Sequence, residues 1–303
     1  MILNEQMKLD FLRSPDGRLI SAASGLVRHK DVYYVIADDQ LSLAVFSLNI
    51  PSHHYFVPLI SGDLPTDKKL RKKVKPDWEA LVALTIEGDF FTLLAVPSGS
   101  TTLRTRGVRV NFQNQKVVST KFVDFTILYH HLQTRFQELN IEGAAVKDNV
   151  LNLFQRGNGR SAQNAVIDLD LKKVLANINE SGVINPECII QIKEYDLGQI
   201  KNVNLSFTDA CYCTDGSLFF LAAAEDIQST YDDGAYVGAV LGQLNTAGEV
   251  ISVTEVECPA KPEGLWVDKT DTGYKIYIVT DADNPDQTSQ LYFGKIESMT
   301  KLR

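Results

Sequence analysis

Short apolar runs, separated by turn residues, recur along the chain in groups of four. The first group comprises residues 24–29, 32–37, 42–48 and 54–60, with a polar turn between its first two runs. Runs of this length that are rich in aromatic and β-branched residues and bounded by turn residues are typical of strands joined as hairpins. The pattern therefore predicts antiparallel β-structure.

The same grouping repeats at intervals of roughly sixty residues, and a repeat of this period sets the architecture. Four-stranded units repeated around an axis are the blades of a β-propeller. The fifth copy has only three runs, and we expect residues 7–12 to supply its fourth strand, which would close the ring and remove a free sheet edge. We thus predict an all-β fold, a five-bladed β-propeller forming a single domain over residues 1–303, with six blades as the alternative.

Two segments break the strand pattern. Leu128, Leu132, Phe136 and Leu139 recur at helical spacing within residues 126–140, which predicts a short amphipathic helix between the second and third blades. A second short helix is expected at residues 171–179, before the last strand of the third blade.

A polar residue stands at the start of the first apolar run of each copy. These residues are Ser24, Glu79, Glu142, Asp209 and Glu263. Equivalent positions on a closed ring converge on one axis, and crowded carboxylates either have raised pKa values or bind a cation. Oxygen ligands without His or Cys favour Ca²⁺ or Mg²⁺, and Ca²⁺ suits a wide, flexible ring better. The alternative is that each acid caps a turn or hydrogen-bonds the backbone of the neighbouring blade.

Charged residues also follow the second run of most copies, and antiparallel geometry places them on the same rim as the five polar residues. Asp38, Glu225 and Asp281 are the candidate general bases of this rim. Four arginines, Arg104, Arg106, Arg156 and Arg160, could bind a phosphate or carboxylate ligand. Salt bridges to the acidic rim are the alternative for these arginines.

Charge and composition exclude several classes of protein. The net charge is −8 and the pI about 5.2, which argues against a nucleic-acid or anionic-membrane partner. We interpret the basic run at residues 68–75 as a solvated loop. The start of the chain has no secretory signal pattern, and no run approaches the ~20 apolar residues of a membrane helix. We therefore expect a soluble, cytoplasmic monomer.

Cysteine and histidine point to no further chemistry. Cys188, Cys211, Cys213 and Cys258 lack metal-ligand spacing, so we expect reduced thiols in or near the core. The five histidines form no arrangement from which a Ser-His-Asp triad can be argued.

The order of the repeated polar residues, read with its flanks as ASGL, DWEAL, IEGA, FTDA and PEGLWV, resembles the calcium-activated nucleotidases (apyrases). That family implies a five-bladed propeller whose axial Ca²⁺ is held by Ser and Glu residues, one from each blade. Asp209 departs from the pattern, which has Ser at that place. The chain also resembles bacterial propellers described as esterase-like or phytase-like, and uncharacterised relatives that carry EGL and TDADNP segments similar to residues 262–265 and 280–285.

Two functions remain open. One is a calcium-dependent hydrolase of phosphate esters or anhydrides, in which the cation activates a water or polarises a phosphoryl oxygen and rim arginines stabilise developing charge. The other is a non-catalytic propeller with a structural cation, whose mouth binds a small anionic ligand or a protein.

Overall fold

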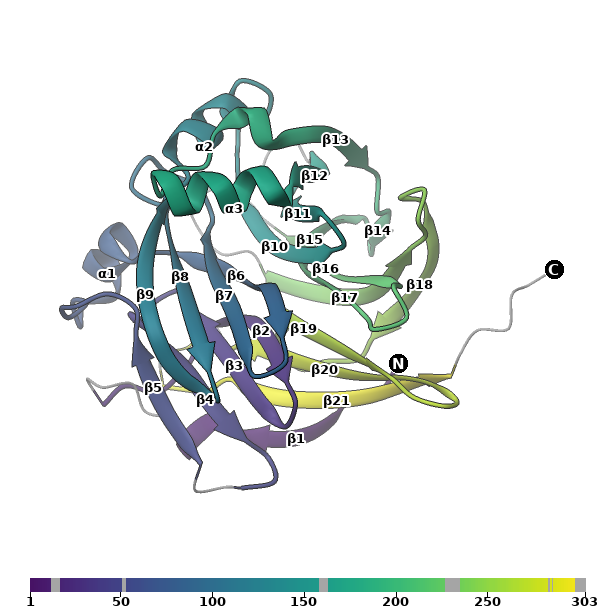
Figure 1. The fold of residues 1–303 in the computed structure, drawn as a ribbon. Helices are drawn as coiled ribbons and strands as arrows, with labels where there is room; N and C mark the ends of the chain where they lie inside the picture. The colour runs from purple at the N-terminus through teal and green to yellow at the C-terminus, as the bar shows by residue number, and fades with distance from the viewer. Residues whose placement is uncertain are drawn as a thin grey trace.

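The chain folds into five antiparallel sheets arranged around one axis (Figure 1). The computed structural model describes residues 1–11, 17–50, 53–157, 163–226, 235–282, 284 and 286–297, and of residues 4–6 the backbone alone. The first strands of successive blades contact one another all the way round, and β19 contacts β2, which closes the ring. The predicted five-bladed β-propeller is therefore confirmed.

Each blade is an up-and-down sheet whose strands follow chain order, except the last. Blade 1 contains β2 (Ala23–His29), β3 (Val32–Ala37), β4 (Ser42–Ser47) and β5 (His54–Pro58). Blade 2 contains β6 (Trp78–Glu87), β7 (Phe90–Pro97), β8 (Arg106–Gln113) and β9 (Lys116–Asp124). Blade 3 contains β10 (Ile141–Lys147), β11 (Val150–Gln155), β12 (Asn164–Asp170) and β13 (Ile189–Tyr195).

Blade 4 contains β15 (Val203–Tyr212), β16 (Leu218–Asp226), β17 (Ala235–Leu244) and β18 (Val250–Val256), with the two-residue β14 (Gln199–Ile200) added beside β15. Blade 5 contains β19 (Lys261–Lys269), β20 (Gly273–Asp281) and β21 (Gln290–Glu297). Its fourth strand is β1 (Asn4–Lys8), which pairs antiparallel with β21. Closure by the N-terminal segment is thus confirmed, but the strand covers residues 4–8 instead of 7–12. It ends at Lys8 because Leu9–Phe11 forms a 3₁₀ turn instead of continuing it.

A β-bulge interrupts the first strand of every blade at the same place. In each case one residue is left without a partner on the second strand, and these residues are Ser24, Glu79, Glu142, Thr208 and Glu263. A bulge bends the strand and re-aims the extra side chain. The repeat is therefore real, but its member in blade 4 is Thr208, one residue before the predicted Asp209.

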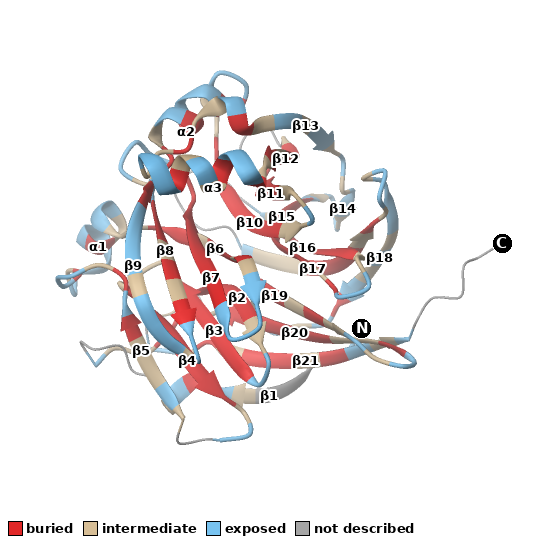
Figure 2. Ribbon diagram, viewed as in Figure 1, coloured by how far each residue is buried: buried red, intermediate tan, exposed pale blue. Residues whose placement is uncertain are grey.

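Burial follows the distance from the axis. The inner strands of each blade are largely buried, whereas the outermost strands β9 and β18 are mostly exposed (Figure 2). Aromatic side chains fill the space between blades, as where the Tyr34 ring of blade 1 meets the Phe91 ring of blade 2 with centroids 5.4 Å apart. Each fully buried side chain of this size contributes about 1.5–3 kcal/mol. The interblade packing holds the rim in place.

Three short α-helices are inserted between strands. The first is α1 (Lys68–Val74), which begins after Asp67, the acceptor of a cap hydrogen bond from the Leu70 N–H. The basic run is thus a helix and not the loop we expected, since an N-cap of this kind stabilises a first turn. Figure 1 shows α1 beside blades 1 and 2.

Both predicted amphipathic helices are present. One is α2 (Thr126–Gln133), which is shorter than predicted although Phe136 and Leu139 beyond it are also buried. The other is α3 (Leu171–Glu180), which begins after the N-cap Asp170. Their apolar faces pack against strands of blades 2 and 3 in one cluster.

Among the residues that the structure describes, no helix is long and apolar enough to cross a membrane. The four cysteines are unpaired thiols, and all except the half-buried Cys258 are buried.

Candidate functional site

The bulged residues and the ends of the second strands share one rim, here called the mouth. The N–H of Asp38 donates to the carbonyl of Ala22, and the N–H of Arg156 donates to that of Asn140. Residues after the second strand of a blade thus lie beside the start of its first strand, as antiparallel geometry predicts.

Two bulged residues link neighbouring blades. The Ser24 hydroxyl donates to the carbonyl of Trp78 at 2.6 Å, and the Thr208 hydroxyl donates to that of Pro262 at 2.9 Å. Each acceptor is the residue before the bulge of the next blade. The two hydroxyls therefore follow the alternative interpretation, in which the repeated residue hydrogen-bonds its neighbour's backbone.

Asp209 lies one residue deeper, where three of the other blades have a glycine. A Cβ at Gly25 would lie 2.7 Å from the backbone nitrogen of Leu81, so the blades are too close there for a side chain. The Asp209 carboxylate instead accepts a hydrogen bond of 2.7 Å from the N–H of Leu265. Burial raises the pKa of Asp209, against the opposing effect of backbone N–H groups of Leu265, Ala210 and Ala144. The Asp209 carboxylate is thus directed at the backbone of blade 5.

Blades 3, 4 and 5 contribute a buried network of alternating charges. Arg156 lies 3.2 Å from Glu142 and 2.8 Å from Glu225, measured from its Nη1 and Nη2. Lys261 Nζ lies 2.8 Å from Glu263, 3.2 Å from Glu225 and 4.0 Å from Asp281. Three inner carboxylates, of Glu142, Glu225 and Glu263, therefore share two cations.

This sharing separates the pKa values of the acids. Burial raises the pKa of Glu263 to about 8, with a further contribution from Glu142 and against the pull of Lys261 and Arg156. Glu225 is also buried, but Arg156 and Lys261 outweigh burial and lower its pKa to about 2. A carboxylate between two cations stays ionised, whereas its neighbour keeps a proton near neutral pH.

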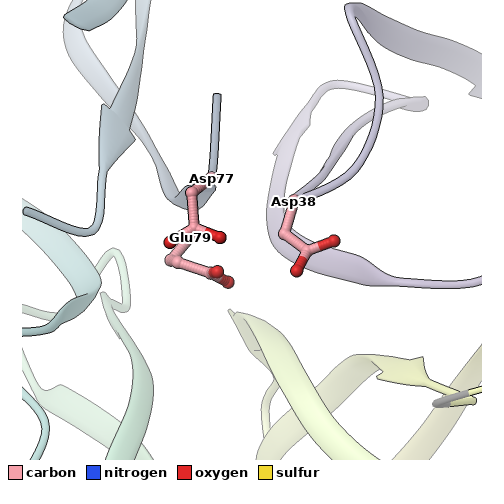
Figure 3. A group of neighbouring side chains, drawn as sticks. All are labelled: Asp38, Asp77 and Glu79. Carbon is pink, nitrogen blue, oxygen red and sulfur yellow. The ribbon is translucent and has the colours of Figure 1, made fainter. Parts of the chain in front are cut away.

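Blades 1 and 2 form a second group of charges at the mouth. Asp38 follows β3, and Asp77 and Glu79 stand at the start of β6, with the Glu79 carboxylate pointing toward Asp38 (Figure 3). Lys75 forms ion pairs with Asp38 and Asp77, the latter at 2.8 Å. Arg104 Nη1 lies 2.8 Å from the other oxygen of Asp77. The Asp77 carboxylate thus lies between two cations.

The pKa values in this group also diverge. Burial raises the pKa of Asp38 to about 6, against the pull of Lys75. Lys75 and Arg104 lower the pKa of Asp77 in spite of its burial. Burial, and then the charges of Asp77, Glu142 and Asp38, raise the pKa of Glu79 well above its ordinary value. Of the three carboxylates of Asp38, Asp77 and Glu79, that of Glu79 is the least neutralised by nearby cations.

Asp38, Asp77 and Glu79 are close enough to ligate one ion. Each offers an oxygen, and these three oxygens lie within 4.8 Å of one another. Two ligands of one Ca²⁺ at about 2.3–2.6 Å from the ion are separated by no more than about 5 Å. An all-oxygen donor set fits Ca²⁺ or Mg²⁺, but the Lys75 ammonium already contacts two of its members.

The sequence-derived candidates therefore separate into different places. Glu79 and Asp38 meet near Arg104; Glu142, Glu263, Arg156 and Glu225 meet in blades 3 to 5, with Asp281 beside Lys261. Arg106 is exposed on β8 and lies over the Phe122 ring at 5.0 Å, away from these groups. Arg160 lies outside the described residues.

Sequence reasoning missed Lys75, Asp77 and Lys261. Asp77 and Lys261 each stand two residues before a bulged glutamate. That repeated spacing was a usable signal for both. Lys75 ends a run of basic residues whose composition is that of a solvated surface.

The chain also matches a protein family. A family model whose description reads "Family of unknown function (DUF6929)" matches residues 19–296. The chain belongs to this family. Blades 1 to 4 and every bulged residue lie inside the matched part of this DUF6929 protein, whereas β1, the fourth strand of blade 5, lies before it. A search of curated proteins gave no match to the sequence.

Solved structures resemble the DUF6929 chain in fold. A mannose phosphorylase from Leishmania mexicana has a TM-score of 0.50 at 11% identity, over 97% of this chain and 89% of that one. A luciferin-regenerating enzyme has a TM-score of 0.47 at 7% identity, over 93% of both chains. A DUF4221 family member from Bacteroides vulgatus has a TM-score of 0.42 at 12% identity, over 98% of both chains. At these identities the likeness is one of fold alone.

Proposed function

We propose that this propeller binds a divalent cation, Ca²⁺ in preference to Mg²⁺, between blades 1 and 2, and that the cation and Arg104 together receive a small anionic ligand at the mouth. The ligands of the cation are Asp38, Asp77 and Glu79. This differs from an axial ring with one ligand from each blade, because Glu142 and Glu263 are compensated by Arg156 and Lys261.

The observation that carries the proposal is the state of Glu79. Within the described part of the chain its carboxylate makes no hydrogen bond or ion pair, whereas Asp38 and Asp77 pair with Lys75. Its oxygen is nevertheless within 4.8 Å of theirs. Lys75 only partly offsets burial and the carboxylates around Glu79, whose pKa stays well above its ordinary value. A carboxylate in such surroundings favours either a proton or a cation, and a divalent ion would bind all three carboxylates at once.

Ca²⁺ is the better fit for the donor set. The three carboxylates come from two different blades, and the hydroxyl of Ser100 lies 3.3 Å from Asp77. Ca²⁺ accepts six to eight oxygens in flexible geometry, whereas Mg²⁺ demands a near-ideal octahedron.

The test is calcium titration of the purified protein by calorimetry and by thermal unfolding. We expect Ca²⁺ to raise the midpoint of unfolding, because an ion that binds only the folded state stabilises it. Glu79→Gln should abolish that shift. Glu87→Gln, an exposed glutamate on the same strand, is the matched control and should retain it. No stabilisation by millimolar Ca²⁺, or an unchanged shift in Glu79→Gln, contradicts the proposal.

Glu142→Gln distinguishes the two possible cation sites. Our proposal predicts calcium affinity within about threefold of wild type for this variant, since Glu142 is paired with Arg156 rather than grouped with Asp38. Loss of binding in Glu142→Gln would instead support a ring with one ligand from each blade.

The second candidate function is hydrolysis of phosphate esters or anhydrides. Arg104 favours it, because its guanidinium lies 2.8 Å from both Asp77 and the Ser100 hydroxyl and could bind a phosphoryl oxygen beside the cation. Asp38 is the general-base candidate nearest to this place, whereas Glu225 is held between Arg156 and Lys261.

Turnover of p-nitrophenyl phosphate and of nucleoside triphosphates, in Ca²⁺ and in EGTA, tests the hydrolase. Calcium-dependent turnover that is lost in Glu79→Gln and in Arg104→Met, but retained in Glu87→Gln, would support it. Calcium binding without turnover would leave the binding function and exclude these substrates.

A further inference from the structure

Lys75 occupies the place that a bound cation would take. It follows the last residue of α1, and its ammonium contacts Asp38 and lies 2.8 Å from Asp77 Oδ1. Its side chain is 13% exposed. Asp38 and Asp77 raise the pKa of Lys75 well above its ordinary value, although burial alone would lower it. The proposed cation site is therefore closed by a cation that belongs to the chain.

Helix α1 contacts the mouth mainly through polar side chains. Besides Lys75, Arg71 lies 3.4 Å from Asp39, and Arg104 donates to the carbonyl of Lys72 at 2.9 Å. Arg71 is the one buried residue of α1, whereas its apolar residues Leu70 and Val74 are 54% and 57% exposed. Because few apolar contacts hold α1 down, the loss of its ion pairs would free its C-terminal end.

The ammonium and a divalent cation cannot share these carboxylates. Both would lie within hydrogen-bond or coordination distance of Asp38 and Asp77, and like charges at about 4 Å repel strongly in a partly buried place. The structure thus allows two states, one with Lys75 on the carboxylates and one with the divalent ion there.

We propose that Lys75 is a tethered competitor of the divalent cation, and that loading of the site displaces its ammonium and releases the C-terminal end of α1 from the mouth. This rests on the proposed cation site at Asp38, Asp77 and Glu79. Linkage is reciprocal, so contacts that hold α1 on the mouth weaken calcium binding. Conversely, bound Ca²⁺ opens the mouth beside Arg104 to the ligand.

The test compares Lys75→Met with Lys73→Met by calcium calorimetry. Lys73 is an exposed lysine on the same helix, so its variant removes the same charge without emptying the site. We expect Lys75→Met to bind Ca²⁺ at least about tenfold more tightly than wild type, within the usual range of coupling between sites. Lys73→Met should stay within about threefold of wild type.

Hydrogen exchange of the unmodified protein is the second measurement and does not depend on the folding of a variant. We expect the amides of residues 71–75 to exchange faster when saturating Ca²⁺ is added. Equal affinities of wild type and Lys75→Met, or unchanged protection of these amides in the calcium-bound protein, would overturn the competition and leave the cation site intact. Absence of calcium binding in both proteins would overturn the cation site itself and, with it, the competition.

Discussion

The carboxylate of Asp209 in blade 4 accepts a hydrogen bond of 2.7 Å from the backbone N–H of Leu265 in blade 5. Backbone N–H groups of Ala210 and of Ala144, in blade 3, also favour its charged form. One buried side chain thus joins blade 4 to blade 5 through a main-chain donor, at the depth where glycines of three other blades let the blades approach directly.

Replacing Asp209 should destabilise the fold without affecting the mouth. Asp209→Ala removes the acceptor of the Leu265 N–H and leaves that buried donor without a partner, and we expect it to lower the free energy of unfolding by about 2 kcal/mol. Urea denaturation measures this effect, with the exposed turn variant Asp271→Ala as control. Calcium affinity should not change; loss of affinity without loss of stability would instead make Asp209 a ligand, as its position in the sequence repeat suggested.

Gly264 is expected to tolerate no side chain. A Cβ there would lie 2.9 Å from the backbone nitrogen of Leu26 and 2.6 Å from Val279 Cγ2. Gly264→Ala should therefore cost about 2 kcal/mol of unfolding free energy by overpacking the contact between blades 5 and 1. Gly238→Ala, whose Cβ would meet only the Ile200 side chain at 3.3 Å, should stay within about 1 kcal/mol of wild type. Equal denaturation midpoints would contradict the close approach of the two blades.

Glu263 should make the protein less stable as pH rises. Its pKa is about 8 in the folded protein against 4.5 ordinarily, so between these values the folded state holds a proton that the unfolded chain has lost. The associated stability is present below about pH 4.5 and disappears as pH rises through 8. In urea denaturation from pH 5 to 8, Glu263→Gln should gain stability relative to wild type with each step. Parallel pH curves for the two proteins would contradict this.

Glu225 should show the opposite dependence. Its pKa of about 2 lies below the ordinary 4.5, so its stabilisation is present above about pH 4.5 and is lost as pH falls toward 2. Glu225→Gln leaves Arg156 and Lys261 short of a buried partner, which costs about 3 kcal/mol at pH 7. That difference should shrink on acidification. A constant difference down to pH 2.5 would show that Glu225 acts through packing and not through its charge.

Deleting residues 1–8 should open the ring. The deletion removes β1 and exposes the edge of β21, the neighbouring strand of blade 5. An unpaired strand edge recruits other chains, so we expect association to dimers or larger species in light scattering, together with a lower unfolding temperature. A stable monomer would show that β1 contributes little to closure.

Sequence alone predicted the architecture because each blade carries complete local signals. Phe90 to Pro97 and the turn before it, for example, show strand composition next to a hairpin turn, and the copies reinforce one another. Helix α3 was equally visible, since Leu171, Val174 and Ile178 are spaced for one buried face. Strand composition, hairpin turns and helical spacing are all set by residues that lie close together in the sequence.

The site was predicted less well, because its geometry depends on register. Alignment of the acidic residues of the five repeats selected Asp209 within residues 207–212 (FTDACY). The bulge instead places Thr208 at the repeated position. A shift of one residue in a strand exchanges its faces, and no local pattern reveals which residue is left unpaired. Lys75 was missed for a different reason, since its contact with Asp38 requires α1 to fold back across blade 1.

Because of the bulge at the start of each first strand, the residue that stands at the mouth does not determine how the rest of the strand pairs. A residue that is left out of the hydrogen-bonded pairing can be exchanged without shifting the register of its neighbours, so the apolar packing between blades is unaffected. Ser24, Glu79, Glu142, Thr208 and Glu263 are the five residues placed in this way around one axis. Single substitutions at these places could give a protein of this fold a new binding preference while every blade keeps its core.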